Sequence, residues 1–323
     1  MAEAGYFLDR FLAPLAHWLS RGDVTDIYIN RPGELWIETL GGQIERHEDA
    51  SLTEQLLARL AKQIAAQGSQ GINRSQPLLA ASLPDGSRVQ VVGPPATRGG
   101  HVMAIRRQVK SNFSLANWTE SDAFAGLEAG RTDIDRAREW HTLGEREAPD
   151  ALAQAVRARR NIIVSGGTSS GKTTFLNSLL AEIPQDERLL TIEDTQELDL
   201  PHRNAVGLIA ARGKLAEADV TAEDLLIAAL RMRPDRIILG ELRGQEAFTF
   251  LRAVNTGHPG SMTTIHADTP QRAIEQLALL LLQSGSRLSR EDVRHYVRES
   301  IDVFVQLERR AGKRRVSQVM VAE

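Results

Sequence analysis

Short apolar runs separated by turn residues dominate the first hundred residues of the chain. Arg31-Pro32-Gly33 and Pro84-Asp85-Gly86 are strong turn signals beside such runs. One stretch instead carries leucine and isoleucine at helical spacing, after a capping-box pattern at residues 51–54. The mixture predicts a small α+β domain over residues 1–107. Its expected strands are residues 24–30, 35–38, 88–92 and 102–106.

The short apolar runs and the helical spacing both weaken between residues 108 and 150. This stretch is rich in polar and charged residues and has few periodic apolar positions. Such a composition is typical of a connection between domains. We therefore predict a linker with short helical pieces over residues 108–150.

After residue 150, short continuous apolar runs alternate with amphipathic helical patterns. Strands that alternate with helices are typical of a mostly parallel sheet covered on both faces. The pattern ends in a hairpin around Ala311-Gly312. We therefore predict an α/β domain over residues 151–323. Its strands are expected at 161–164, 188–192, 236–239 and 261–265, and its helices at 151–157, 221–232, 245–254 and 270–283.

Composition and charge narrow the class of protein. The chain has 323 residues, and its net charge of -3 argues against a dedicated nucleic-acid binder, although a local basic patch stays open. It has no cysteine, so neither a disulfide nor a thiolate zinc site can form. The first ten residues do not resemble a signal peptide, and the longest apolar stretch, 277–282, is far shorter than the ~20 residues that span a bilayer. We expect a cytoplasmic protein that can dock on a membrane through partners.

One motif carries specific chemistry. The segment after the apolar run 161–164 fits the phosphate-binding pattern G-x-x-x-x-G-K-[ST] and opens a helix. Glycines let backbone N–H groups surround a phosphate, and the start of the helix faces the anion. Lys172 would bridge the β- and γ-phosphates of ATP, and the Thr173 hydroxyl would bind Mg²⁺. The loop consists of Gly166, Gly167, Thr168, Ser169, Ser170, Gly171, Lys172 and Thr173.

Acidic residues follow two further apolar runs. Glu193 and Asp194 end the first run, with Glu197 close behind, and Glu241 ends the second. Hydrolysis needs a group that orients water, and ligands bind at the carboxyl edge of open α/β sheets. We therefore expect these carboxylates near the phosphates. Gly240 stands where many ATPases carry an aspartate, so metal binding would depend on the phosphate loop and water.

Histidine and arginine give weaker signals. His266 lies just past the expected strand 261–265, where it could sense the γ-phosphate, although a single histidine is more often structural. Arginine suits bidentate contacts to phosphate, but its chemistry alone does not choose among the arginines of the two domains. The first-domain candidates are Arg88, Arg98, Arg106 and Arg107.

Taken together, several segments resemble the type II/type IV secretion traffic ATPases. The chain is most similar to the VirB-type ATPase of type IV secretion and conjugation systems. The resemblance extends from about residue 24 to the end and weakens across the predicted linker. Its segments are GGTSSGKTT from Gly166, TIEDT from Thr191, RPDRIILGELR from Arg233 and NTGHPGS from Asn255, followed by His266-Ala267. In the first domain, PLL from Pro77, PDG from Pro84 and GPP from Gly93 are similar to the same subgroup.

The resemblance implies roles for particular residues. Residues 166–174 correspond to the Walker A loop, which adds Thr174 to the expected ATP-binding set. Glu193 belongs to the Asp box as the candidate water activator, and Glu241 is the Walker B glutamate. His266 is the His-box histidine. Together with Lys172, these three side chains are the expected catalytic set.

The resemblance also implies an architecture: a RecA-like P-loop ATPase core with a smaller first domain, a hexameric ring, and ATP with Mg²⁺ held between the domains. Arg106, and by a weaker match Arg88, would reach the γ-phosphate. Hydrolysis would change the angle between the domains and power substrate transfer or pilus assembly. The implied partners are inner-membrane secretion-system subunits, with the protein cytoplasmic and peripheral to that membrane. We expect no sequence-specific binding to nucleic acid.

Three alternatives stay open. A nucleic-acid-stimulated motor with the same core would show ATP hydrolysis that single-stranded DNA stimulates and salt suppresses. A non-catalytic switch would bind ATP only to assemble a ring. A type II secretion or pilus-assembly ATPase would share most motifs; however, type II relatives often carry a four-cysteine zinc module, and this chain has no cysteine.

Overall fold

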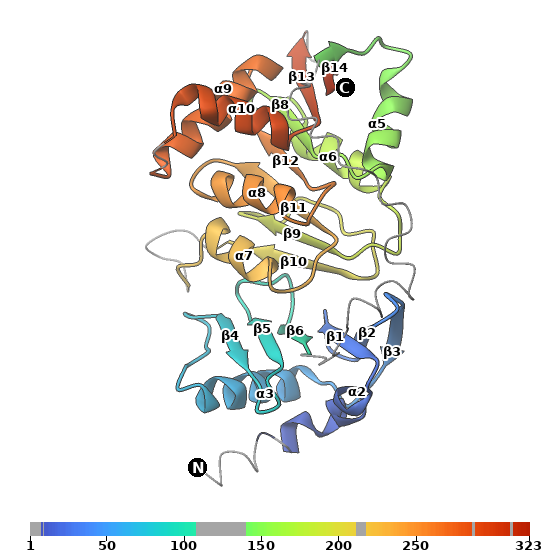
Figure 1. The fold of residues 1–323 in the computed structure, drawn as a ribbon, viewed down its shortest axis with the longest axis vertical. Helices are drawn as coiled ribbons and strands as arrows, with labels where there is room; N and C mark the ends of the chain where they lie inside the picture. The colour runs from blue at the N-terminus through green and yellow to red at the C-terminus, as the bar shows by residue number, and fades with distance from the viewer. Residues whose placement is uncertain (1–7, 9, 108–139, 211–217, 286–287, 311–312) are drawn as a thin grey trace, which may run out of the picture.

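Two β-sheets, one in each half of the chain, organise the fold (Figure 1). The computed structural model describes residues 8, 10–107, 140–210, 218–285, 288–310 and 313–323. The first sheet is antiparallel throughout, in the order β3-β2-β1-β6-β5-β4. Its strands are β1 (Val24–Ile29), β2 (Glu34–Thr39), β3 (Ile44–Glu48), β4 (Leu78–Ser82), β5 (Arg88–Val92) and β6 (Val102–Arg106).

Helix α3 (Glu54–Gln67) covers one face of this sheet. Its apolar residues recur at three- and four-residue spacing, so Leu57 and Ile64 point to the same side and are fully buried. The helix begins after Thr53, whose hydroxyl accepts a hydrogen bond from the N–H of Leu56 at 3.2 Å. In the described part of the chain before the sheet lie η1 (Ala13–Leu15) and α2 (Ala16–Ser20).

The second sheet confirms the predicted α/β class. Its order is β10-β9-β11-β12-β8-β13-β14-β7, and the six strands from β10 to β13 are parallel. Strands β14 and β7 are antiparallel to their neighbours. The strands are β7 (Trp140–Thr142), β8 (Ile162–Gly166), β9 (Leu189–Glu193), β10 (Ala205–Ile209), β11 (Arg236–Leu242), β12 (Met262–Ile265), β13 (Val303–Arg310) and β14 (Lys313–Ala322).

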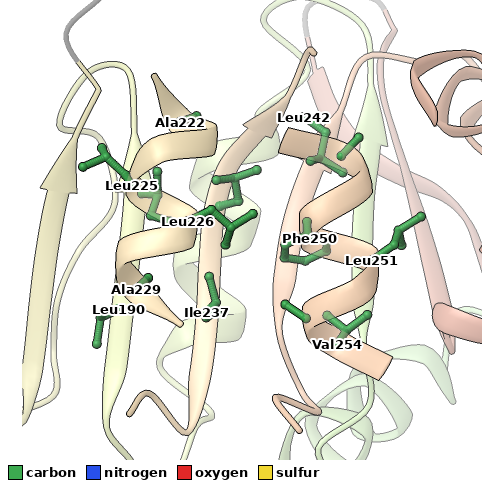
Figure 2. Close-up of a cluster of buried hydrophobic side chains, with 14 of the residues drawn as sticks. Leu190, Ala222, Leu225, Leu226, Ala229, Ile237, Leu242, Phe250, Leu251 and Val254 are labelled. Atoms are coloured by element: carbon green, nitrogen blue, oxygen red, sulfur yellow. The ribbon is translucent and has the colours of Figure 1, made fainter. Parts of the chain in front are cut away.

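Helices cover both faces of the second sheet. Successive strand residues point to opposite faces, so Ile237 packs with one helical layer and Ile238 with the other. Figure 2 shows Leu226 and Phe250 directed from their helices onto the first of these faces. That layer contains α7 (Ala222–Ala229), α8 (Glu246–Asn255), α9 (Pro270–Gln283) and α10 (Arg290–Ser300), and the other contains α5 (Ala148–Arg157) and α6 (Lys172–Leu180).

The two halves of the chain are packed against each other. The face of the first sheet that α3 does not cover carries Tyr28, Trp36 and Ala104. These side chains share one buried apolar cluster with Ile192 and Leu208 of the second sheet. Because this cluster is continuous, the first domain lies directly beside β9 and β10.

Most of the predicted linker, residues 108–139, lies outside the described residues, so the division of the chain at 108–150 stays a prediction. Residues 140–150 are described. They contain β7, which pairs with β14, and the start of α5. This part of the chain therefore contributes to the layers of the second domain.

Candidate nucleotide-binding site

A cavity of about 500 Å³ lies at the carboxyl edge of the second sheet, where β8, β9 and β11 end. Lys172, Glu193 and Glu241, which the sequence places far apart, all line it. A cavity of this size suits a nucleotide. The other residues of the wall are Ser169, Ser170, Gly171, Thr173, Thr174, Ile192, Asp194, Thr195, Glu197, Ala222, Leu239, Gly240, Arg243, Thr264 and Arg314.

The phosphate loop joins the end of β8 to the first turn of α6, as its sequence predicts. A Cβ on Gly166 would overlap the Ser170 hydroxyl and lie 2.9 Å from the Leu307 carbonyl oxygen, so the position has room only for glycine. Gly171 has φ +95°, which favours glycine, and it precedes the first residue of α6. The free N–H groups at the start of this helix therefore face the cavity.

The ammonium group of Lys172 lies inside the loop. Its Nζ donates to the carbonyl oxygens of Gly166 and Gly167, at 3.0 and 3.2 Å. Burial lowers the pKa of the Lys172 ammonium, while the carboxylate of Glu241 opposes that shift. A cation at this position can pair with phosphate oxygens at the centre of the cavity.

Thr173 carries a hydroxyl that could hold a metal ion. Its hydroxyl donates to Oε2 of Glu197 at 2.9 Å, so a hydroxyl and a carboxylate oxygen lie side by side. Mg²⁺ is usually bound through one or two such oxygens together with phosphate and water. Among the residues that the structure describes, no group of three or more acidic or histidine side chains could hold a metal alone. The donor set therefore fits Mg²⁺ that arrives with a triphosphate.

Glu193 is buried, with its side chain only 3% exposed, and both of its oxygens are engaged. Oε1 accepts hydrogen bonds from the N–H groups of Glu197 and Leu198, at 2.9 and 2.7 Å. Oε2 contacts the guanidinium of Arg98, which comes from the first domain. A Cβ on Gly240 would lie 3.3 Å from the Glu193 Cγ, so a larger residue at 240 would crowd this carboxylate.

Glu241 has a more open environment, with 21% of its side chain exposed. Its Oε2 accepts a hydrogen bond from Nε of Arg243 at 2.6 Å. The same guanidinium reaches Oδ2 of Asp194 at 3.3 Å. Arg243 therefore links Asp194, just after β9, to Glu241, near the end of β11.

The structure does not bring His266 into this cavity. His266 is exposed and lines a separate hollow of about 420 Å³, together with Asp268 and Arg272. Thr264, two residues earlier in β12, lines the nucleotide cavity instead. A role for His266 in this chain's own site therefore stays a prediction.

Arg88 and Arg106 also lie away from the cavity. They are opposite each other in the β5–β6 pairing, and both line a hollow with Arg231 just beyond the end of α7. Ala222, at the start of α7, lines the nucleotide cavity. The two sites are thus separated by the length of a helix of eight residues, about 12 Å at 1.5 Å per residue.

Sequence reasoning did not single out three arginines that the structure places at the site. Arg98 was one of four first-domain candidates, and its contact with Glu193 is what distinguishes it from the other three. Arg243 lies two residues after Glu241 in the sequence, and its hydrogen bond to that carboxylate is what identifies it. Arg314 comes from β14 and packs over the phosphate loop, since a Cβ on Gly171 would lie 3.0 Å from its Cδ.

Comparison with known proteins adds independent evidence. Residues 131–315 match the family described as "Type II/IV secretion system protein". The chain is 37% identical to the type IV secretion system protein VirB11 of Bartonella henselae over 327 residues, which cover 95% of this chain and 91% of that protein. It is 40% identical to the type IV secretion system protein PtlH of Bordetella pertussis over 321 residues, with the same shares covered. The crystal structure of the VirB11 ATPase from the Brucella suis type IV secretion system, in complex with sulphate, matches with a TM-score of 0.85 and 34% identity, covering 97% of this chain and 96% of that one.

Proposed function

Because the chain belongs to the type II/IV secretion system protein family, we propose that it is an ATPase whose hydrolysis of ATP powers a type IV secretion system. The observation that carries this proposal is the convergence of Lys172, Glu193 and Glu241 on one cavity beside the phosphate loop. The relatives that bear the names VirB11 and PtlH are type IV secretion system proteins, which supports this branch of the family.

Binding of the triphosphate is assigned to the loop 166–174. Its backbone N–H groups and the start of α6 would surround the β-phosphate. The Lys172 ammonium would exchange its contacts with the two loop carbonyls for contacts with phosphate oxygens. Mg²⁺, held at Thr173 with Glu197 beside it, would neutralise charge that develops on the phosphates.

Orientation of the attacking water is assigned to Glu241 in preference to Glu193. Glu193 is almost fully buried and already accepts three hydrogen bonds from protein groups, so it is less available to a water molecule than Glu241 is. Among the described residues, Glu241 is engaged by Arg243 through Oε2, and its side chain is partly open to the cavity. We therefore assign Glu193 to holding the loop that follows β9.

A ring of several copies, which the family resemblance predicts to be a hexamer, would complete the site. Arg88 and Arg106 lie at the far end of α7 from this chain's own nucleotide cavity. Because they lie away from this chain's own cavity, we propose that they contact the γ-phosphate of the nucleotide in a neighbouring subunit. Loss of that phosphate would then be sensed by the next copy in the ring.

We place the protein in the cytoplasm, peripheral to the inner membrane, with membrane-embedded secretion subunits as its partners. In the part of the chain that the structure describes, no helix has both the length and the apolar character to cross a bilayer. We assign attachment to the membrane to those partners.

Measurement of ATP hydrolysis by the purified protein and by Lys172→Ala tests the proposal. Loss of the ammonium should reduce turnover by about 100-fold or more, because this fixed positive charge stabilises the negative charge that develops on the phosphates during hydrolysis. The matched control is Lys62→Ala, which removes an exposed lysine of α3. Full turnover by Lys172→Ala would refute the site.

The same assay separates the rival functions. Hydrolysis that rises with single-stranded DNA and falls steeply with salt would support a nucleic-acid motor. Nucleotide binding and ring assembly without turnover, in the presence of Mg²⁺, would support a switch that does not hydrolyse ATP.

A further inference from the structure

A loop of the first domain pairs with β10, the strand at one side of the second sheet. The N–H of Arg98 donates to the Gly207 carbonyl at 3.1 Å, and the N–H of Ile209 donates to the Ala96 carbonyl at 3.0 Å. An antiparallel bridge lies between these two hydrogen bonds. The loop therefore fixes the position of the first domain relative to the strands that carry the nucleotide site.

The side chain of Arg98 crosses β10 and ends on Glu193. A Cβ on Gly207 would overlap the Arg98 side chain, so glycine is needed to leave room for this path. The Arg98 guanidinium contacts Oε2 of Glu193, and the two side chains are only 13% and 3% exposed. A charge-assisted contact in so dry an environment strongly favours the geometry in which the partners meet.

From Glu193 the contacts continue to the phosphate loop. Oε1 of Glu193 accepts from the N–H groups of Glu197 and Leu198, which fixes the turn after β9. The carboxylate of Glu197 accepts from the hydroxyl of Thr173 at 2.9 Å. An unbroken series of hydrogen bonds thus joins a first-domain arginine to the hydroxyl expected to bind Mg²⁺.

The opposite end of β9 is also held by the first domain. Arg188, the residue before β9, donates to Oδ1 of Asn30 at 2.7 Å, and its guanidinium lies 4.1 Å from the ring centre of Tyr28. Burial lowers the pKa of Arg188 to about 10. Both ends of β9 contact the first domain. A movement of the first domain would therefore displace β9 at both of its ends.

We propose that Arg98 is a positioning residue through which the docked first domain sets the affinity of the phosphate-loop site for Mg²⁺. The inference rests on the proposed ATPase function. When the first domain is docked, Arg98 and Glu193 hold the turn after β9, and the Glu197 carboxylate lies beside Thr173. Withdrawal of Arg98 leaves Glu193 buried without its cation, and the turn relaxes away from the metal position.

The test is equilibrium binding of a fluorescent ADP analogue, measured once with Mg²⁺ and once with EDTA. The dissociation constant in EDTA divided by the dissociation constant with Mg²⁺ gives the factor by which Mg²⁺ tightens binding. In Arg98→Ala this ratio should fall by about 10-fold, the lower end of the loss seen when a group that supports a metal ligand is removed, because Arg98 acts through Glu193 and Glu197. Binding in EDTA should stay close to that of the unmodified protein, because the loop N–H groups and Lys172 are untouched.

Two further variants separate positioning from general damage. Glu193→Gln keeps a side-chain oxygen for the N–H groups of the turn but removes the charge that Arg98 pairs with. If Arg98 acts through Glu193, the double variant should lose no more Mg²⁺-dependent tightening than the stronger single variant. Arg98→Lys keeps a cation and should restore part of the tightening.

Arg233→Ala is the matched control. It removes a different ion pair between the two domains, from Arg233 to Glu38 at 2.9 Å, which does not touch the nucleotide cavity. It should leave the effect of Mg²⁺ unchanged. If Arg98→Ala keeps the full tightening, or if Arg233→Ala loses as much, the inference is wrong. Neither result would touch the ATPase proposal, which fails only if the unmodified protein neither binds nor hydrolyses ATP.

Discussion

The guanidinium of Arg236 is paired with the carboxylate of Glu187 through two hydrogen bonds of 2.7 Å, at a place where the arginine side chain has no exposed surface. A third hydrogen bond, from Nη1, reaches the Val156 carbonyl at 2.6 Å. Arg236 is the first residue of β11, and Glu241 lies near the other end of the same strand. This pair therefore anchors the end of β11 that lies away from the nucleotide.

We expect Arg236→Ala to lower the free energy of unfolding by about 3–5 kcal/mol, because it leaves a buried carboxylate without its main partner. Urea unfolding of the two proteins measures the difference. The control is Arg157→Ala, which breaks an exposed pair with Glu182 and should cost less than about 1 kcal/mol. Equal losses for the two variants would contradict the special role of the buried pair.

Replacing both Arg236 and Glu187 tests whether the loss of stability comes from the unpaired buried charge. The double variant Arg236→Met with Glu187→Met removes both charges together and fills similar volume. We expect it to be more stable than Arg236→Ala, because no unpaired buried charge remains.

Glu241→Gln should bind ATP with nearly unchanged affinity but hydrolyse it about 100-fold more slowly, because the amide cannot accept a proton from water. Steady-state turnover together with binding of a fluorescent analogue separates the two effects. Glu291→Gln, at a side chain that is 82% exposed on α10, serves as the control. Normal turnover by Glu241→Gln would remove Glu241 from the mechanism.

Mixed rings test whether Arg106 acts on a neighbour. Arg106→Ala and Lys172→Ala should each be nearly inactive alone. If Arg106 reaches the nucleotide of the next subunit, a mixture should regain activity, because some interfaces combine an intact arginine with an intact loop. Mixtures that stay as inactive as their components, despite exchange of subunits, would place the arginine and the loop of a working site in one chain.

His258 should make the protein less stable in mild acid. Its Nδ1 lies 3.0 Å from the Pro234 carbonyl oxygen, and burial lowers its pKa below the usual 6.5. The unfolded chain therefore takes up a proton near pH 6.5 before the folded protein does. The contribution to stability is full above that pH and is lost as pH falls through the lower folded pKa.

Urea unfolding between pH 7.5 and 5.5 measures this effect. His258→Asn keeps a donor for the carbonyl but cannot titrate, so its stability should fall less over this range than that of the unmodified protein. A parallel fall in both proteins would show that other groups are responsible.

Strong local patterns made much of the fold predictable. The amphipathic stretch at 270–283 predicted α9 with the bounds that the structure has, because apolar spacing, an N-terminal proline and the Thr269 cap all agree. Helix α10 was missed, since only Val293, Val297 and Ser300 of its eleven residues are buried. Its signal was the capping box from Ser289 to Asp292, which the polar composition concealed.

The candidate site was predictable where a motif fixes local geometry. The loop 166–173 and the acids that end β9 and β11 meet as expected, because parallel strands deliver their carboxyl ends to one edge. The contact between Arg98 and Glu193 was not predictable, since it depends on how the two domains pack. For the same reason, no local pattern could indicate that Arg88 and Arg106 lie near Arg231 instead of the nucleotide. The resemblance to the secretion ATPases is confirmed by the family match and by the VirB11 and PtlH relatives.

The pairing of residues 96–98 with β10 has a consequence for the integrity of the ATPase half. An uncovered strand at the side of a sheet is a template on which other chains can add, and β10 is apolar along its length. The first domain blocks such growth by occupying the hydrogen-bonding groups of Gly207 and Ile209. The contact that joins the two domains thus also protects the second sheet from aggregation. The ATPase half without the first domain would expose β10 as an edge strand on which other chains could assemble.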